Sequence, residues 1–415
     1  MRITWHCDNA LTTTTTGFNV VERKGIGHPD SLADLIAEEF SRRYSRHGIN
    51  RFGFVPNHWV DKVALIGAES EVTFGTYTVR KPVTAYLFGK MTRSIGAEAL
   101  PIEDLFTATV EEVLVESVGR DILLYLRTVS ENTAGVGADH PASFYRPAEA
   151  GKSGVHGKNE VANDTAFCNA YAPADPVDLL AIDIENHVNS PAFKADLDGL
   201  GSDVKVMIVR ASDVLETTVC LPVRPEAAPS RQEYRALITE AQDRLTAFVE
   251  AHPVVREHPW LTRMSVNTKD HGQGAYLAPF GTSLGKGDCG LVGRGNKANG
   301  VISSRGGGGI EAPAGKNPMH HTGKLYTLAA EQLASRIHGE LGIPNAVVLV
   351  SRNGDRLDDP SFVGVRTAYR AGSRDRTSIE GLAAETLSGL PALSERLLSL
   401  SPIERFRDPA LVLEV

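Results

Sequence analysis

Hydrophobic positions recur along this chain with two different periods. A helical period is clearest over residues 30–44, 102–118, 231–250 and 325–341. Apolar, β-branched runs typical of strands occupy residues 63–66, 83–87, 204–209, 216–221 and 346–350. Helices and strands alternate irregularly, and several strand pairs look antiparallel. The pattern therefore predicts an α+β fold rather than a doubly wound sheet.

Two long segments lack either period. Residues 134–163 are rich in Gly, Pro, His and Lys, and residues 281–318 hold an unusual density of glycine. Long irregular segments of compact enzymes commonly carry function. At the helix starts, we expect Asp30 or Ser31 to cap the first helix and Pro101 to occupy the first turn of the second.

Composition narrows the class of protein. The chain has 415 residues, a formal net charge of −8, 42% hydrophobic and 23% charged residues, which is typical of a globular domain. The negative charge argues against nucleic acid or an anionic membrane as partner. We find no signal-peptide pattern at the start and no apolar stretch long enough to cross a bilayer. Four scattered cysteines without a CxxC pair suggest a reduced, cytoplasmic protein.

The first candidate motif is Glu22-Arg-Lys-Gly-Ile-Gly-His28-Pro-Asp30, which leads directly into a predicted helix. Its glycines let the backbone approach a ligand, and a helix start favours an anion. His28 is able to donate a proton to a departing oxygen, and Asp30 is a hard oxygen ligand suited to Mg²⁺. The residues alone leave open a simple turn with Asp30 as the helix cap.

The second motif spans residues 285–296 and reads Gly-Lys-Gly-Asp288-Cys-Gly-Leu-Val-Gly-Arg294-Gly-Asn296. It contains a formal GxGxxG match but no strand–turn–helix context, so we reject a dinucleotide-binding interpretation. One carboxylate and one arginine on a glycine-rich loop suit a metal-bound phosphate. A flexible surface loop is the alternative.

The third motif joins Arg305 and four glycines to Gly-Lys316-Asn-Pro-Met-His320-His321-Thr-Gly-Lys324. It is not a P-loop, because the expected upstream glycine and the Ser/Thr after the lysine are missing. Lys316, Lys324 and Arg294 are nevertheless candidates to neutralise a triphosphate. A zinc site at the two histidines is disfavoured, because no cysteine lies nearby.

A fourth segment begins Asn-Asp164-Thr165 and runs to Pro173. The Glu22–Asp30 motif, Val-Asp61-Lys, this segment, Gly-Arg294-Gly-Asn and Ala-Gly-Lys316-Asn-Pro follow one another along the chain. In this order they resemble the S-adenosylmethionine synthetase family (methionine adenosyltransferase), the archaeal-type branch in particular. The resemblance is collinear from about residue 18 to beyond residue 360. It implies that sulfur attacks C5′ of ATP and that the released triphosphate is then hydrolysed.

The resemblance also implies residue roles. Catalytic roles fall to His28 beside the leaving O5′, Asp164 near the reacting centre, Asp288 near adenosine and the amino acid, and Arg294 and Lys316 on phosphate oxygens. Asp30 is the implied metal ligand. The residues implied in binding the nucleotide and its ions are Glu22, Gly135, Gly137, Asp288, Arg294, Lys316, His320 and Lys324.

Beyond single residues, the resemblance implies three similar interleaved α/β units, at about residues 1–130, 131–262 and 263–415. It implies ATP and L-methionine or a related amino acid as substrates, Mg²⁺ and K⁺ as cofactors, and a homodimer or dimer of dimers with active sites at the subunit interface.

Some residues depart from the branch pattern. Phe167-Cys-Asn-Ala-Tyr171 stands where Phe-Gly-Val-Gly-Tyr is usual, Phe280 where Thr is usual, and His320 where Asn is usual. Because these positions are expected to line the substrate, three hypotheses stay open. They are an S-adenosylmethionine synthetase, a specialised relative acting on another amino acid or nucleotide, and a non-catalytic regulatory or binding subunit.

Overall fold

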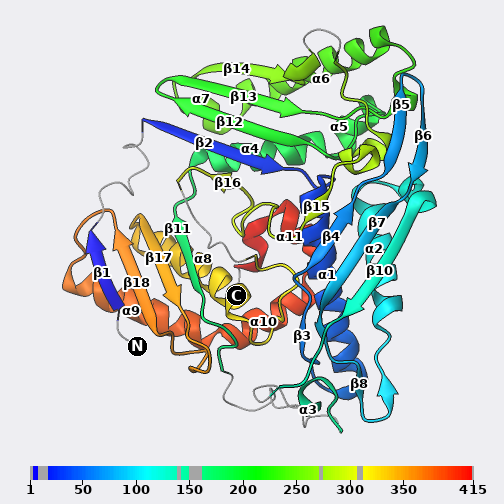
Figure 1. Ribbon diagram of the computed structural model, residues 1–415. Helices are drawn as coiled ribbons and strands as arrows, with labels where there is room; N and C mark the ends of the chain where they lie inside the picture. Colours follow the sequence, from blue (N-terminus) through cyan, green and yellow to red (C-terminus); the bar gives the residue numbers. More distant parts are fainter. Residues whose placement is uncertain are drawn as a thin grey trace.

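The computed structural model describes residues 3–7, 17–137, 142–148, 161–270, 274–305 and 312–413. Three mixed sheets lie on three sides of the molecule, and helix α11 (Pro402–Arg407) lies between them at the centre (Figure 1). Helices and sheets of this kind confirm the α+β prediction. Within the described residues, no helix is long and apolar enough to cross a membrane.

The first sheet has the order β10-β7-β4-β15, and β3 pairs with β7. Its strands are β3 (His58–Trp59), β4 (Val63–Ile66), β7 (Val83–Met91), β10 (Leu126–Asn132) and β15 (Gly290–Leu291). Helices α1 (Pro29–Phe52) and α2 (Ile102–Ser117) pack on each other and on this sheet. Phe40 and Phe106, whose rings meet edge to face at 5.8 Å, lie in their shared core.

The second sheet has the order β14-β13-β12-β2-β16. Its strands are β2 (Phe18–Lys24), β12 (Lys205–Ala211), β13 (Val214–Cys220), β14 (Leu261–Val266) and β16 (Ile302–Ser303). Helix α4 (Pro176–Val188) contacts β2 and β12, and α6 (Arg231–Ala251) contacts β14.

The third sheet has the order β1-β18-β17-β11. Its strands are β1 (Ile3–Cys7), β11 (Phe167–Ala172), β17 (Asn345–Val350) and β18 (Phe362–Thr367). Helix α8 (Thr322–Leu341) packs on β11 and β17, and α9 (Ser373–Ser388) packs on α8. The remaining elements are β5 (Glu69–Thr73), β6 (Thr76–Lys81), β8 (Ser94–Ile95), β9 (Glu98–Ala99), α3 (Ala142–Tyr145), α5 (Pro191–Asp196), α7 (Pro253–Arg256) and α10 (Leu390–Ser399).

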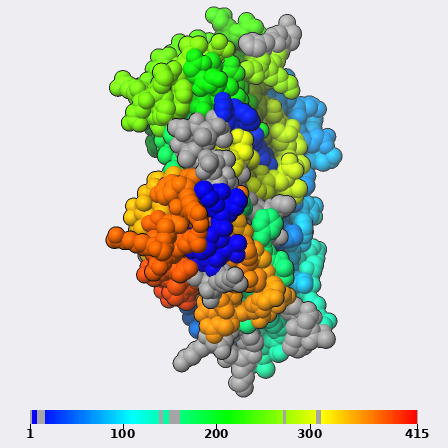
Figure 2. All heavy atoms as spheres, turned by 90° about the vertical axis from the view of Figure 1, so that its left-hand side faces the viewer, coloured from blue at the N-terminus to red at the C-terminus, as the bar shows by residue number. Residues whose placement is uncertain are grey.

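Distant parts of the chain exchange strands between these sheets. β1 pairs in parallel with β18, so the first described residues lie beside the last third of the chain. Figure 2 shows this neighbourhood as blue atoms set against orange ones. β2 in turn pairs antiparallel with β12, about 180 residues later. The expected interleaving is thus visible in the sheets, while the unit boundaries near residues 130 and 262 stay a prediction.

The strongly periodic segments form the elements that they predict. The helices observed are Pro29–Phe52, Ile102–Ser117, Arg231–Ala251 and Thr322–Leu341, and Val63–Ile66 is a strand with the predicted ends. The expected cap of α1 was wrong. His28 is the N-cap, and its Nδ1 accepts the Asp30 N–H at 3.1 Å. Asp30 and Ser31 lie inside the first turn, whereas Pro101 directly precedes α2.

Candidate active site

The turn before α1 is held by close backbone contact with the segment that leads into β12. Gly25 N donates to Val204 O at 2.6 Å, and Gly27 N donates to Ser202 O at 3.1 Å. A Cβ on Gly25 would lie 2.6 Å from Val204 O, and one on Gly27 would lie 2.2 Å from Ser202 Oγ. Both positions therefore require glycine, and the contact fixes the direction in which His28 leaves the turn.

His28 has a defined protonation state. Burial lowers the pKa of its imidazole, and the nearby positive charge of Lys24 adds to that, while the negative charge of Asp203 opposes both. The ring is therefore neutral at pH 7. Because Nδ1 accepts the Asp30 N–H, the proton of the neutral ring resides on Nε2. His28 thus presents an N–H donor from the start of a helix.

A pocket opens beside His28. Its wall includes the buried carboxylate of Asp203, which accepts hydrogen bonds from the backbone N–H (2.8 Å) and the hydroxyl of Ser283. Burial raises the pKa of this carboxyl group. Lys286 Nζ lies 4.3 Å from the centre of the Tyr276 ring. Other lining residues that bear charge are Lys205, Lys269, Asp270 and Asp288.

Positive side chains surround the carboxylate of Asp30 next to this pocket. Lys24 Nζ donates to Asp30 Oδ2 at 2.9 Å, and Arg294 Nε lies 3.8 Å from the same oxygen. Lys24 also donates to the carbonyl of Arg294, which ties the glycine-rich loop to β2. The Arg294 side chain is 69% exposed, so its guanidinium is accessible to a ligand. Glu22, by contrast, pairs with Lys205 at 3.0 Å.

The surroundings of Asp30 suit a metal–nucleotide complex better than a bare metal ion. Oδ1 accepts one hydrogen bond, from Leu291 N at 3.0 Å, and a carboxylate offers about four lone-pair sites. Lone pairs therefore remain for Mg²⁺. A bare cation would meet Lys24 and Arg294, whereas a triphosphate brings the negative charge that offsets them. Among the described residues, no three His, Cys, Asp or Glu side chains gather into a metal site.

A second group of predicted site residues lies further along α1. Lys316 Nζ pairs with Asp61 Oδ2 at 3.0 Å, and its carbonyl accepts from Ser41 Oγ at 3.3 Å. Ser41 is 13 residues beyond His28, which is about 20 Å of helix. The Asp164 carbonyl accepts from Thr322 Oγ1 at 3.4 Å, at the start of α8. One chain therefore does not bring His28 together with Lys316 and Asp164.

Other predicted residues have structural surroundings. Lys324 Nζ donates to Glu38 Oε2 at 2.6 Å, and both side chains are almost wholly buried. His320 is also buried, with its ring 6.1 Å from that of Trp59. Gly135 is exposed, and nothing lies within 4 Å of a Cβ built there. Gly137 is exposed too, and residues 138–141 after it lie outside the described residues.

One departure expected to line the substrate, Phe280, faces the core instead. The Phe280 ring packs against Tyr77 and Tyr125 at 5.5 and 5.7 Å and is buried in the core of the first sheet. Residues 167–171 form a regular strand paired with β17, and extended backbone has no need of glycine. The aromatic ring therefore fills the core, so the expectation of an altered substrate wall at Phe280 was wrong.

Sequence reasoning missed five charged residues of the pocket, namely Asp203, Lys205, Lys269, Asp270 and Lys286. Asp203 and Lys205 flank the start of a strand and resemble any pair of charges at a strand end. The pairing of β12 with β2 brings them to the His28 turn. A polar Gly-Ser-Asp directly before a hydrophobic run was the available signal, and it is a weak one.

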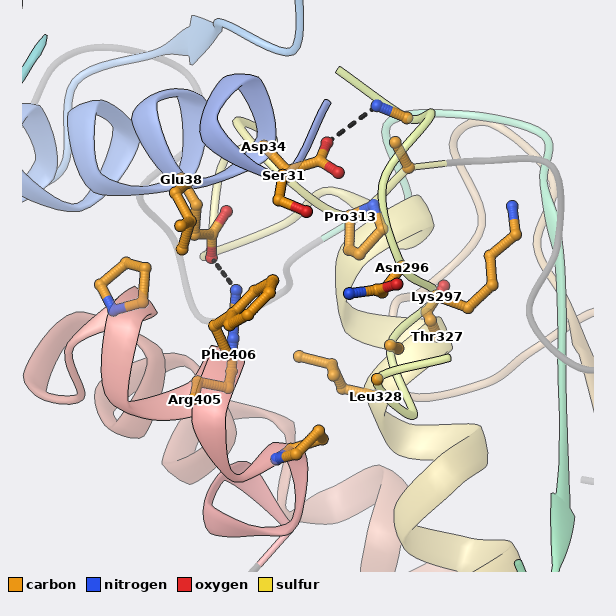
Figure 3. A pocket seen from close by; sticks show the side chains of 18 of the residues that line it. Ser31, Asp34, Glu38, Asn296, Lys297, Pro313, Thr327, Leu328, Arg405 and Phe406 are labelled. Atoms are coloured by element: carbon orange, nitrogen blue, oxygen red, sulfur yellow. Dashed lines mark hydrogen bonds and ion pairs between the residues drawn. The ribbon is translucent and has the colours of Figure 1, made fainter. Parts of the chain in front are cut away.

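Behind the glycine-rich loop lies another pocket, between α1, α8 and α11 (Figure 3). Asp34 accepts the Gly293 N–H at 2.8 Å, and a Cβ on Gly295 would lie 2.1 Å from its Oδ2. Burial raises the pKa of Asp34 to about 7. The loop that carries Arg294 therefore wraps around this carboxyl group.

The chain matches known proteins over almost its whole length. The profile of the family "S-adenosylmethionine synthetase (AdoMet synthetase)" matches residues 3–400. The S-adenosylmethionine synthase of Aeropyrum pernix is 31% identical over 391 residues, which is 91% of this chain and 93% of that protein. The synthase of Sulfurisphaera tokodaii is 30% identical over 390 residues, with 91% and 93% covered.

A solved structure shares the fold. The S-adenosylmethionine synthetase of Campylobacter jejuni, described as unusual, aligns with a TM-score of 0.62 at 15% sequence identity, covering 95% of this chain and 93% of that one. This likeness concerns the fold alone. Together with the profile match and the relatives at 30% identity or more, it confirms the resemblance inferred from the motifs. This chain belongs to the S-adenosylmethionine synthetase family.

Proposed function

We propose that this protein makes S-adenosylmethionine from ATP, L-methionine and water, and releases phosphate and diphosphate. The observation that carries the proposal is the neutral His28 at the start of α1, with its N–H on Nε2 and a pocket beside it to which three lysines contribute. A donor at the departing oxygen and cations for a polyphosphate are what expulsion of a triphosphate requires.

In the proposed reaction, a sulfur lone pair of methionine forms the S–C5′ bond while the C5′–O5′ bond breaks. The electron pair goes to O5′ of the triphosphate, and His28 Nε2–H donates a hydrogen bond to that oxygen. Arg294, Lys205 and Lys286 offset the charge of the leaving group. Mg²⁺ held by Asp30 would supply further positive charge to the phosphates, and K⁺ is an expected second ion. Asp288 orients adenosine and the amino acid.

A second subunit is proposed to contribute Lys316, Asp164 and His320 to each active site. The Lys316 carbonyl contacts Ser41, which is about 20 Å along α1 from His28, and Asp164 bonds to Thr322, beside the Lys316 segment. We therefore infer a homodimer in which each site combines the His28 pocket of one subunit with the Lys316 group of the other. Glu22, Gly135 and Gly137 are proposed to bind the nucleotide or its ions, whereas Lys324 acts through the buried pair with Glu38.

The first experiment supplies ATP, Mg²⁺, K⁺ and L-methionine and follows product mass and phosphate. S-adenosylmethionine with equal phosphate and diphosphate supports the proposal. Triphosphate cleavage without this product would favour the specialised relative, and no turnover would favour the binding subunit. In His28→Asn, loss of the Nε2 donor lowers kcat by about 10²-fold or more; an unchanged rate would refute the role of His28.

A mixing experiment tests the composite site. His28→Asn and Lys316→Met are each nearly inactive alone if both groups serve one site. In randomly mixed dimers, half of the dimers hold both variants and each of these has one intact site. About one quarter of wild-type activity should therefore return. No recovery after verified subunit exchange would show that the two groups do not meet across an interface.

A further inference from the structure

A separate cavity lies on the other side of the Gly25–His28 turn. It is bounded by the ends of α2 and α4, the start of α5 and the side chain of Arg407 at the end of α11. Ile26 and Ser202 line this cavity, whereas the neighbouring His28 and Asp203 line the pocket described above. The Gly25–His28 turn thus separates the cavity from the His28 pocket, and different residues line the two.

The cavity holds cations that form no close ion pair with a carboxylate in the described part of the chain. Neither Lys194 nor Arg224 forms an ion pair there, and Arg224 uses one nitrogen to donate to the Val118 carbonyl at 3.1 Å. Both side chains line the cavity. Burial and the positive charge of Arg224 lower the pKa of Lys194 to about 8, while the negative charge of Glu185 opposes this shift. A pair of partly buried cations without such an ion pair favours a bound anion.

The acidic groups nearby are engaged or exposed. Glu185 pairs with the buried Arg23 at 3.0 Å and accepts from Ile26 N and from Asn189 Nδ2 at 3.1 and 2.7 Å. Glu116 lines the cavity but is exposed to solvent, where its charge is screened. Arg407, also exposed, adds a third cation.

Buried polar atoms without a partner among the described residues gather at the same place. They include the hydroxyls of Ser117 and Ser202, whose residues are 6% and 5% exposed, and Nε of Arg224. A buried donor without an acceptor is energetically unfavourable. Several such donors around one cavity indicate a ligand that offers several acceptor oxygens. Asn189 Oδ1 is an unpartnered acceptor, which suits a protonated phosphate oxygen.

We propose that this cavity binds a phosphate-type oxyanion, of the size of phosphate or diphosphate, through Lys194, Arg224, Ser117 and Ser202. Tetrahedral oxyanions offer the many acceptors that these donors require, and a guanidinium matches them by parallel hydrogen bonds. This binding is independent of the reaction proposed for the His28 pocket, because different residues carry it.

The test is calorimetric titration of the full-length protein with diphosphate, and separately with phosphate, at low ionic strength and without ATP or methionine. Lys194→Gln removes a cation of the cavity, and Lys286→Gln removes a cation of the His28 pocket. Lys81→Gln changes an exposed lysine that pairs with Glu69 and is the matched control. Thermal unfolding of each variant verifies its fold.

The expected result is an anion site that weakens at least about tenfold in Lys194→Gln, because a charge-assisted hydrogen bond is lost, and that persists in Lys286→Gln and Lys81→Gln. Ser202→Ala should weaken the same site by a smaller factor without lowering the melting temperature. If all anion binding disappears in Lys286→Gln, or Lys194→Gln binds like wild type, the cavity is not an anion site and the proposal is wrong.

Discussion

Helix α1 carries two lysine–carboxylate pairs, whose acidic residues are eight positions apart. The two pairs have different surroundings. At the start of the helix, Lys24 pairs with Asp30, and the side chains are 10% and 8% exposed beside the accessible Arg294. Further along, Lys324 pairs with Glu38, and the side chains are 2% and 6% exposed.

The second pair is saturated, in the sense that the carboxylate and the lysine both have their partners within the fold. Glu38 also accepts from Arg405 at 3.0 Å and from the Gly315 backbone N–H at 3.0 Å, and Lys324, despite the cost of burial, finds its partner there. Around Asp30, Lys24 and Arg294 together bring more positive charge than one carboxylate offsets. The comparison teaches that a motif lysine is available to a ligand where positive charge exceeds negative charge around it. Where its charge is fully paired and hydrogen-bonded, the lysine stabilises the fold.

The largest expected effect follows from breaking the saturated pair. Glu38→Gln leaves Lys324 and Arg405 buried without their carboxylate, so the free energy of unfolding should fall by about 3–5 kcal/mol. Urea denaturation measures the loss. The matched control is Glu98→Gln, which removes an exposed pair with Arg51 and should cost under about 1 kcal/mol. Equal losses in the two variants would remove the distinction between the two pairs.

The pH dependence of the same group sharpens this prediction. Lys324 and Arg405 overcome the effect of burial and lower the pKa of Glu38 to about 2, from its ordinary value of 4.5. The folded state therefore binds this proton less readily than the unfolded state does. The stability contributed by Glu38 is present above pH 4.5 and is lost as pH falls toward 2. In Glu38→Gln, the acid-induced loss of stability over this window should be smaller.

A smaller effect, on activity rather than stability, is expected at the other pair. Lys24→Met removes positive charge and the bond to the Arg294 carbonyl, so kcat/KM should fall about tenfold. Because the charge of Lys24 helps lower the pKa of His28, the acidic limb of the pH–rate profile should move to higher pH. Lys81→Met, at an exposed pair, is the control; identical profiles in the two variants would contradict the assignment.

The sequence predicted the structural features that depend on a local residue pattern. Periodicity located the four long helices, and the His28 turn was recognisable because two glycines precede a helix start. It did not reveal that β2 pairs with β12, since partners 180 residues apart leave no local pattern. The sequence therefore did not predict that Asp203 lines the His28 pocket. Phe280 was misassigned because its positive φ of 63° turns the ring into the core, which residue type alone does not indicate.

The smallest predicted effect concerns Asp34, which lies between the two pairs on α1. Burial and the negative charge of Asp30 raise the pKa of Asp34 to about 7, although the Gly293 and Gly295 amides and Lys24 favour the ionised form. The folded state therefore binds this proton more tightly than the unfolded state does. The stability linked to it is complete below pH 3.8 and is lost as pH rises toward 7.

Asp34→Asn keeps an oxygen that accepts the Gly293 N–H but cannot ionise. The variant should therefore be more stable than wild type at pH 8, by about 1 kcal/mol or more, and the difference should shrink as pH falls below 7. Thermal unfolding at pH 5 and pH 8 measures both. Because the Arg294 loop keeps its anchor, kcat should change less than about threefold. A loss of stability at pH 8 would mean that the ionised carboxylate holds the loop. Asp34 would then have a structural role like that of the Lys324–Glu38 pair.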